Sequence, residues 1–284
     1  MTGFQQQGCS GSGFQHATPD IDENVKRALD KIKKKFLVMS GKGGVGKTSV
    51  AVNLAMALAE KGYKTGIMDV DVHGPDVPGM LGLSGIKASS SGDKLDPMHY
   101  SDNLSAISIA CVLPDNDTAV IWRGPLKHSA ITQFISEVNW GDLDFLIIDS
   151  PPGTGDEPMS VAQTVSDAYA IVVTTPQEVA LSDVRKSINF CKKLNLEIFG
   201  VVENMSGYAC PHCGEAIDPF GIGGGEKMAD RFGLRFLGRI PFDPNLVKAE
   251  DTGDAFQVKY KDAPVTKAFH DIADIVAGKL TISA

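Results

Sequence analysis

The sequence has 284 residues, of which 43% are hydrophobic and 22% charged, as expected of a globular protein that buries a sizeable core. Its formal net charge of −8 argues against nucleic-acid binding through bulk charge, and no apolar run approaches the roughly 18 residues of a membrane span. Residues 1–20 lack the basic and apolar segments of a secretory signal, so we expect a cytoplasmic protein.

In chain order, the pattern predicts a flexible tail over residues 1–20, rich in Gln, Gly and Ser, and then a short helix over 22–35 that ends in a basic run. Apolar runs and helical patterns alternate after it. We predict a strand at 36–39, a helix at 48–61, a strand at 65–68, an exposed loop at 84–101, a strand at 104–109, a helix at 126–138, strands at 145–148 and 170–174, a helix at 180–194, strands at 199–202 and 236–240, and a helix at 265–279.

Uninterrupted apolar strands that alternate with helices indicate a parallel sheet covered on both faces. The predicted fold is therefore α/β, with three layers and a mostly parallel sheet between helices. We expect one ATPase domain over residues 21–284, with a metal-binding loop near 205–225. Ligands of such folds bind beyond the carboxyl ends of the strands, where most of the motifs below fall.

A glycine-rich motif follows the strand at 36–39 and opens the next helix, which is the context that a phosphate-binding P-loop requires. Its glycines let backbone N–H groups point at phosphate oxygens. We expect Lys47 to bridge the β- and γ-phosphates of ATP and the Thr48 hydroxyl to ligate Mg²⁺. The predicted nucleotide-binding residues are Gly41, Lys42, Gly43, Gly44, Val45, Gly46, Lys47, Thr48 and Ser49.

Lys42 is a second lysine inside this loop, directly after its first glycine. One interpretation is a solvated loop lysine. The other is that Lys42 contacts nucleotide phosphate, including that of a second subunit, and stabilises charge in the transition state as an arginine finger does.

Carboxylates end two of the predicted strands. Asp149 precedes a Ser-Pro-Pro-Gly turn and suits the magnesium-holding position of a Walker B motif, while Gly153 could approach the γ-phosphate through its N–H. Asp69 and Asp71 share one face of the extended chain. We predict that Asp71 orients the attacking water. The alternative is that both are solvated loop carboxylates. His73 is predicted to be an ordinary loop residue.

Cys210 and Cys213 form a Cys-x-x-Cys pair in a loop. Two thiolates at this spacing can bind zinc or an iron–sulfur cluster, and a redox-active pair or a purely structural one are the alternatives. Because two thiols are half of the usual ligand set, the simplest completion is a twofold dimer in which each chain contributes both. Cys111 and Cys191 look like small buried hydrophobes.

Together these motifs resemble the Mrp/ApbC family of iron–sulfur cluster carrier ATPases, within the deviant Walker A group that includes MinD and ParA. The resemblance spans about residues 25–280 and is carried by the P-loop, by residues 69–82, 122–125 and 149–157, and by the stretch from Val202 to Ser206 that leads to the cysteines.

The resemblance implies a homodimer that binds ATP and Mg²⁺, holds a [4Fe–4S] cluster between its two cysteine pairs and transfers it to apo-proteins. It implies that Lys42 reaches the partner's nucleotide and that Asn204 contacts adenine. The chain departs from the family at Asp76, where serine is usual, and at Ser150, where relatives place Met, Leu or Thr. Part of the family has an N-terminal four-cysteine site, but Cys9 stands alone here, so we expect no second cluster.

Two other functions compete with cluster transfer. A MinD- or ParA-like positioning ATPase needs a membrane helix or a DNA-binding surface, and the short segment 279–284 and the negative net charge disfavour both. The second is a zinc-stabilised dimeric ATPase with no delivery role. We predict slow Mg²⁺-dependent hydrolysis, because the attacking water depends on loops that close only in a proper complex.

Overall fold

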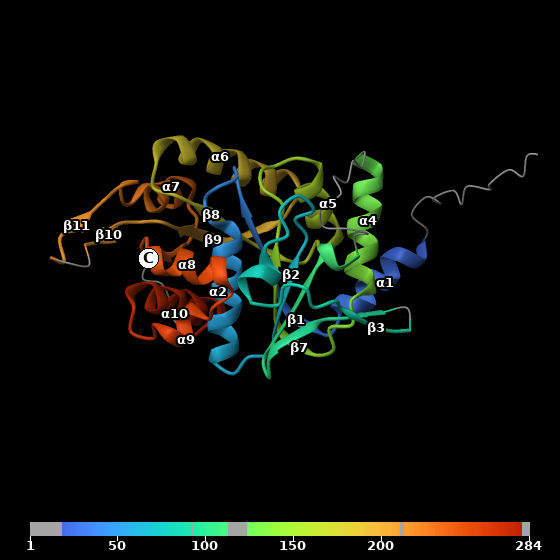
Figure 1. Ribbon diagram of the computed structural model, residues 1–284. Helices are drawn as coiled ribbons and strands as arrows, with labels where there is room; N and C mark the ends of the chain where they lie inside the picture. Colours follow the sequence, from blue (N-terminus) through green and yellow to red (C-terminus); the bar gives the residue numbers. More distant parts are fainter. Residues whose placement is uncertain (1–18, 93, 113–123, 211–212, 280–284) are drawn as a thin grey trace, which may run out of the picture.

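The computed structural model describes residues 19–92, 94–112, 124–210 and 213–279 (Figure 1). An eight-stranded sheet forms its centre, in the order β12-β9-β8-β1-β7-β2-β6-β5. Neighbouring strands are parallel apart from β5, which runs antiparallel to β6. The strands are β1 (Ile32–Ser40), β2 (Thr65–Asp69), β5 (Met98–Ser101), β6 (Leu104–Ser108), β7 (Leu143–Asp149), β8 (Tyr169–Thr174), β9 (Glu197–Glu203) and β12 (Phe236–Arg239).

Helices cover both faces of this sheet (Figure 1). One face carries α2 (Lys47–Glu60), α3 (Val77–Met80), α8 (Pro244–Thr252), α9 (Phe256–Lys259) and α10 (Pro264–Ala277). The other carries α1 (Pro19–Leu29), α4 (Gly124–Glu137), α5 (Asp156–Thr164), α6 (Glu178–Lys193) and α7 (Gly224–Phe232). The predicted three-layer α/β fold is therefore confirmed.

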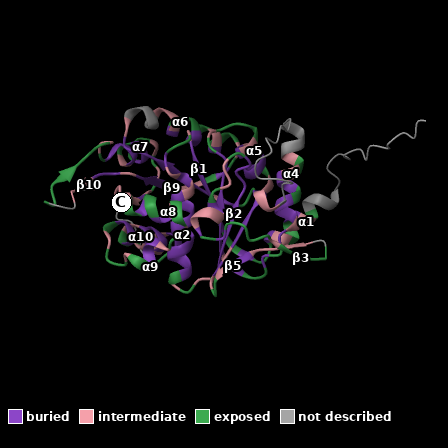
Figure 2. Cartoon of the chain, viewed as in Figure 1, coloured by how far each residue is buried: buried purple, intermediate pink, exposed green. Residues whose placement is uncertain are grey.

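The side chains of the central strands explain this two-sided burial. Along β1, Phe36 and Val38 belong to one hydrophobic core, while Leu37 and Met39 belong to the other. Successive side chains of a strand point to opposite faces, so a strand covered by helices on both sides must be apolar throughout. The buried strands appear purple at the centre of the molecule in Figure 2.

Two of the predictions for secondary structure are wrong in detail. The helix expected at 22–35 ends at Leu29, and residues from Ile32 onward pair with β7 instead. Pairing with the neighbouring strand thus decides the conformation of residues 32–35, although their local sequence pattern is helical. The loop expected at 84–101 contains the small hairpin of β3 (Ser89–Ser91) and β4 (Lys94–Asp96) and the edge strand β5. Weakly apolar edge strands leave little periodic signal in a sequence.

Several predictions fall on residues outside those described. They are residues 1–18 of the expected tail, with Cys9, the Trp122-Arg123 part of the family motif, and the C-terminal residues 280–284. None of the helices in the described part of the chain has the length and the continuous apolar character of a membrane span.

Candidate functional site

A cavity of about 440 Å³ lies beyond the carboxyl ends of the strands, at the N-terminal end of α2. The loops after β1, β2, β7, β9 and β12 line it, together with α8. The residues that contribute to its walls include Lys42, Lys47, Asp71, Asn204 and Phe242. The fold thus brings together residues as far apart in the sequence as Lys42 and Phe242, at the edge where parallel sheets bind ligands.

The P-loop has the backbone shape that its glycines allow. Gly44 and Gly46 have φ angles of 78° and 75°, in the left-handed region that only glycine adopts without strain. A Cβ on Gly46 would lie 2.2 Å from the Asn204 Nδ2 atom. That amide donates a hydrogen bond of 3.0 Å to the Val45 carbonyl. The predicted adenine-contacting residue therefore also supports the phosphate loop.

Lys47 and Thr48 line the phosphate end of the cavity, and the fully buried Asp149 lies directly behind them. The Lys47 ammonium lies 2.5 Å from Asp149 Oδ1, and the Thr48 hydroxyl donates to Asp149 Oδ2 at 2.7 Å. Burial raises the pKa of Asp149, and Lys47 and Thr48 oppose that effect. Hydroxyl and carboxylate oxygens are the ligands that Mg²⁺ prefers, so Thr48 and Asp149 fit this ion as its holders.

The two carboxylates after β2 have different surroundings. Asp71 lines the cavity and accepts hydrogen bonds from the N–H groups of His73 and Gly74. Asp69 is fully buried beneath it and accepts from the Asp71 N–H at 3.0 Å. Burial and the neighbouring Asp149 raise the pKa of Asp69 well above its ordinary value. Of the two, Asp71 is the one that can reach a bound molecule.

The remaining phosphate-end residues differ in how they face the cavity. Lys42 is half-buried and lines the cavity. This position is compatible with a solvated loop lysine and with a lysine that contacts nucleotide phosphate. The Gly153 N–H donates to the Ser40 carbonyl at 3.0 Å, so contact with a phosphate requires that bond to break. Pro152, one residue earlier, lies in the cavity wall. His73 lies 3.1 Å from Glu157 and links the loop after β2 to α5.

The wall of the cavity also contains residues that sequence analysis missed. Glu250 of α8 lines it and accepts hydrogen bonds from the Ser49 hydroxyl and, at 2.9 Å, from Asn53 Nδ2. Burial raises the pKa of Glu250 to about 7. Met205 and Phe242 supply apolar surface there. No motif points to Glu250 or Phe242, because neither belongs to a glycine-rich loop or a strand-end carboxylate pair, whereas Met205 lies within the Val202–Ser206 stretch that carries the family resemblance.

The cysteine pair lies in a hairpin that extends from one end of the molecule, at the left of Figure 1. Its strands are β10 (Tyr208–Ala209) and β11 (Ala216–Ile217). The Gly214 N–H donates to the Cys210 carbonyl at 2.8 Å, which closes the turn, and Cys213 is exposed. No group of three or more potential metal ligands occurs among the described residues.

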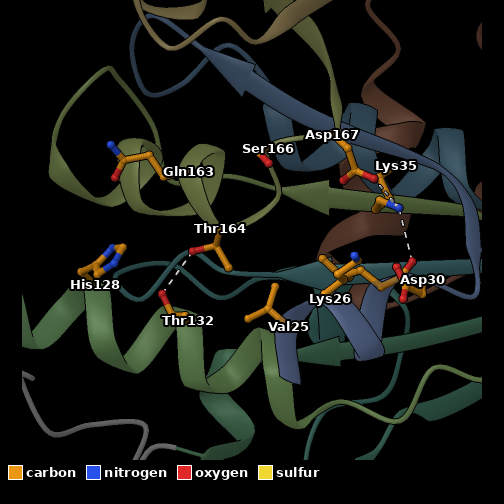
Figure 3. A pocket seen from close by; sticks show the side chains of 11 residues that line it. Val25, Lys26, Asp30, Lys35, His128, Thr132, Gln163, Thr164, Ser166 and Asp167 are labelled. Atoms are coloured by element: carbon orange, nitrogen blue, oxygen red, sulfur yellow. Dashed lines mark hydrogen bonds and ion pairs between the residues drawn. The ribbon is translucent and has the colours of Figure 1, made fainter. Parts of the chain in front are cut away.

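A second cavity, of about 590 Å³, lies between α1, α4 and α5 and shares no residue with the first (Figure 3). Buried Lys35 lies at one side of it, 2.9 Å from Asp167 and 3.3 Å from two backbone carbonyls. Thr132 and Thr164 hydrogen-bond each other at 3.1 Å. The buried lysine is satisfied by the protein itself, so Lys35 supplies no free charge that would select a ligand in this cavity.

The parallel sheet, the P-loop and the carboxylates at the strand ends together define a P-loop nucleoside triphosphatase. The model of the ParA family described as NUBPL iron-transfer P-loop NTPases matches residues 31–277. The chain belongs to this family of iron–sulfur cluster carriers, and the resemblance noted from the sequence is confirmed.

Curated relatives agree with this membership. An iron–sulfur cluster carrier protein of Saccharolobus solfataricus is 49% identical over 257 residues, which cover 90% of this chain and 87% of the relative. A cytosolic Fe-S cluster assembly factor NUBP2 homolog of Dictyostelium discoideum is 47% identical over 251 residues, covering 87% and 95%.

Solved structures agree with the fold. The nucleotide-binding protein of Archaeoglobus fulgidus, in complex with ADP, aligns with a TM-score of 0.75 and 37% identity, over 87% of this chain and 96% of that one. The septum site-determining protein MinD of Pyrococcus horikoshii, complexed with Mg-ADP, aligns with a TM-score of 0.63 and 26% identity, over 88% and 99%.

Proposed function

We propose that this protein is a Mg²⁺-dependent ATPase that holds a [4Fe–4S] cluster between two copies of the chain and transfers it to apo-proteins in the cytoplasm. The observation that carries the proposal is the presence, in the same chain, of a P-loop cavity and an outlying Cys-x-x-Cys pair. The names of the relatives, which include cluster carriers and a cytosolic assembly factor, support it. Neither a membrane nor a nucleic acid is needed.

The phosphate end of the cavity suits ATP hydrolysis. Lys47 would leave Asp149 for the β- and γ-phosphates when ATP binds, which frees Asp149 and Thr48 to hold Mg²⁺. Mg²⁺ held by these two side chains would neutralise charge on the phosphate oxygens. Asp71 would accept a hydrogen bond from the attacking water, whose oxygen bonds to the γ-phosphorus as the bridging oxygen leaves with ADP. Lys42 would contact the nucleotide of the second copy.

The other end of the cavity suits a nucleoside. Asn204 offers an amide to the base, and Met205 and Phe242 offer apolar surface to its faces. We assign the adenine to this end because the phosphates must lie at the P-loop.

The thiol pair suits a cluster shared by two chains. Four thiolates are the usual ligand set of a [4Fe–4S] cluster, and a twofold axis through the hairpins supplies them from Cys210 and Cys213 of each copy. Ile217 and Ile222, near the hairpin, are 45% and 49% exposed, which is apolar surface that a second copy would cover.

Iron and acid-labile sulfide, measured after anaerobic reconstitution, test the cluster assignment. We expect about four of each per dimer, and their loss in Cys210→Ala/Cys213→Ala. Cys111→Ala, which removes a thiol elsewhere in the chain, is the matched control and should retain the cluster. Bound zinc without iron would instead indicate a zinc-stabilised dimer. Iron that remains bound after the double substitution would refute the assignment as a cluster carrier.

A further inference from the structure

The cysteine hairpin is attached to the end of β9, the strand that also leads to the nucleotide cavity. Asn204 follows β9 directly and lines the cavity, and only five residues separate it from Cys210. The outgoing segment is held against the loop after β12 by two backbone bonds. The Ser206 N–H donates to the Ile240 carbonyl at 2.9 Å, and the Phe242 N–H donates to the Gly207 carbonyl at 2.8 Å.

The segment that returns from the hairpin is tied to the same strand end by one buried side chain. Glu203, the last residue of β9, is fully buried, and its carboxylate accepts from the N–H groups of Gly223 and Gly225 at 2.8 and 2.5 Å. These glycines begin α7, the helix that follows the hairpin. The same carboxylate accepts from the Ser206 hydroxyl at 2.5 Å. Glu203 therefore joins the outgoing and returning segments.

An aromatic contact connects the cavity wall to the hairpin itself. Phe242 lines the cavity, and its ring packs edge-on against Tyr208 of β10, with 5.9 Å between ring centroids. It packs in the same way against Phe220, in the returning segment, at 6.2 Å. A nucleoside that packs against the Phe242 side chain would thus also restrain both segments of the hairpin, since packed aromatic rings have little free volume between them.

We propose that Glu203 and Tyr208 are positioning residues that transmit nucleotide occupancy to the cysteine pair, by holding the hairpin and the cavity wall as one unit. This inference rests on the proposed function, and it adds the path within one chain that couples the nucleotide cavity to the cysteine pair. A bound nucleoside packs against Phe242 and Asn204, restrains the segment between Asn204 and Cys210, and makes the thiols less accessible. Without the two anchoring contacts, the cavity can fill while the hairpin moves independently.

Thiol alkylation tests this route without any cluster. Metal-free, reduced full-length protein is treated with iodoacetamide, with and without saturating ADP, and the modification rates of Cys210 and Cys213 are followed by mass spectrometry. Buried Cys191, whose thiol pKa is raised to about 12 by burial, is the internal reference for intact folding. The oligomeric state is recorded under the same conditions, so that rates are compared between species of equal size.

We expect ADP to slow alkylation about fivefold or more in the wild-type chain, the size of a typical coupling between sites. In Glu203→Gln, where an amide nitrogen replaces one accepting oxygen, the effect should fall below about twofold, while the dissociation constant for ADP stays near the wild-type value. Glu226→Gln is the matched control. The Glu226 carboxylate pairs with the same Arg239 as Glu203 does, but the N–H groups of Gly223 and Gly225 donate to Glu203.

Tyr208→Leu is the second variant, because it removes the aromatic contact at a residue outside the cavity wall and decides the question if Glu203→Gln does not fold. Both variants retaining the wild-type effect of ADP would overturn the route, and so would an absence of any effect in the wild-type chain. Either result leaves the proposed function standing if iron and sulfide still load. Failure of cluster loading with a normal effect of ADP refutes the proposed function alone.

Discussion

Glu250→Gln is expected to stabilise the protein at pH 8 and to change its stability little at pH 5. Glu250 is half-buried in the cavity wall, where its carboxylate accepts from Ser49 and Asn53. Burial raises its pKa from 4.5 to about 7. The folded chain therefore binds more protons than the unfolded chain between these values, and the free energy of unfolding must fall as the pH rises from about 4.5 through 7.

The size of the effect follows from the same values. At about 1.36 kcal/mol for each pKa unit, the range from 4.5 to about 7 gives an upper limit of about 3 kcal/mol. Water in the cavity screens the charge, so we expect about 1–2 kcal/mol. Gln keeps an oxygen that accepts both hydrogen bonds but carries no charge, so this part of the pH dependence should vanish.

Urea unfolding between pH 5 and pH 8, at a fixed protein concentration without nucleotide or iron, measures the effect. Glu197→Gln, an exposed position at the start of β9, is the matched control and should follow the wild-type curve. A Glu250→Gln variant whose stability declines with pH as steeply as the wild type would refute the assignment of this pH dependence to Glu250.

Two further substitutions test the phosphate end of the cavity. Lys47→Ala should abolish ATP binding and destabilise the fold by about 3–5 kcal/mol at pH 8, because the buried Asp149 loses its cation. Nucleotide titration measures the first effect and urea unfolding the second. Retained ATP affinity would contradict the role of the lysine. Gly46→Ala should cost about 1–3 kcal/mol in unfolding free energy through its positive φ, with further loss from the clash with Asn204. Gly43→Ala is its control, since an added Cβ there meets nothing within 4 Å; equal losses in the two variants would argue against this strain.

Much of the fold was predictable because its signals are local. Strands buried on both faces must be continuously apolar, so β1, β2, β7, β8 and β9 are visible as short hydrophobic runs. The chain between Leu29 and Lys35 was misread, because its pairing with β7 depends on residues more than 100 positions away. The edge strand β5 was missed because it has one neighbour and a weak apolar pattern.

The sequence by itself determined the P-loop, the aspartates at the strand ends and the thiol pair, because each depends on residue types at short, fixed spacing. Only the tertiary structure decided that Asp71 lines the cavity while Asp69 is sealed beneath it, although the two are two residues apart. It also decided that Glu250 meets Ser49 across 201 residues of sequence. Such contacts depend on where separate strands end in space, and no local pattern encodes that distance.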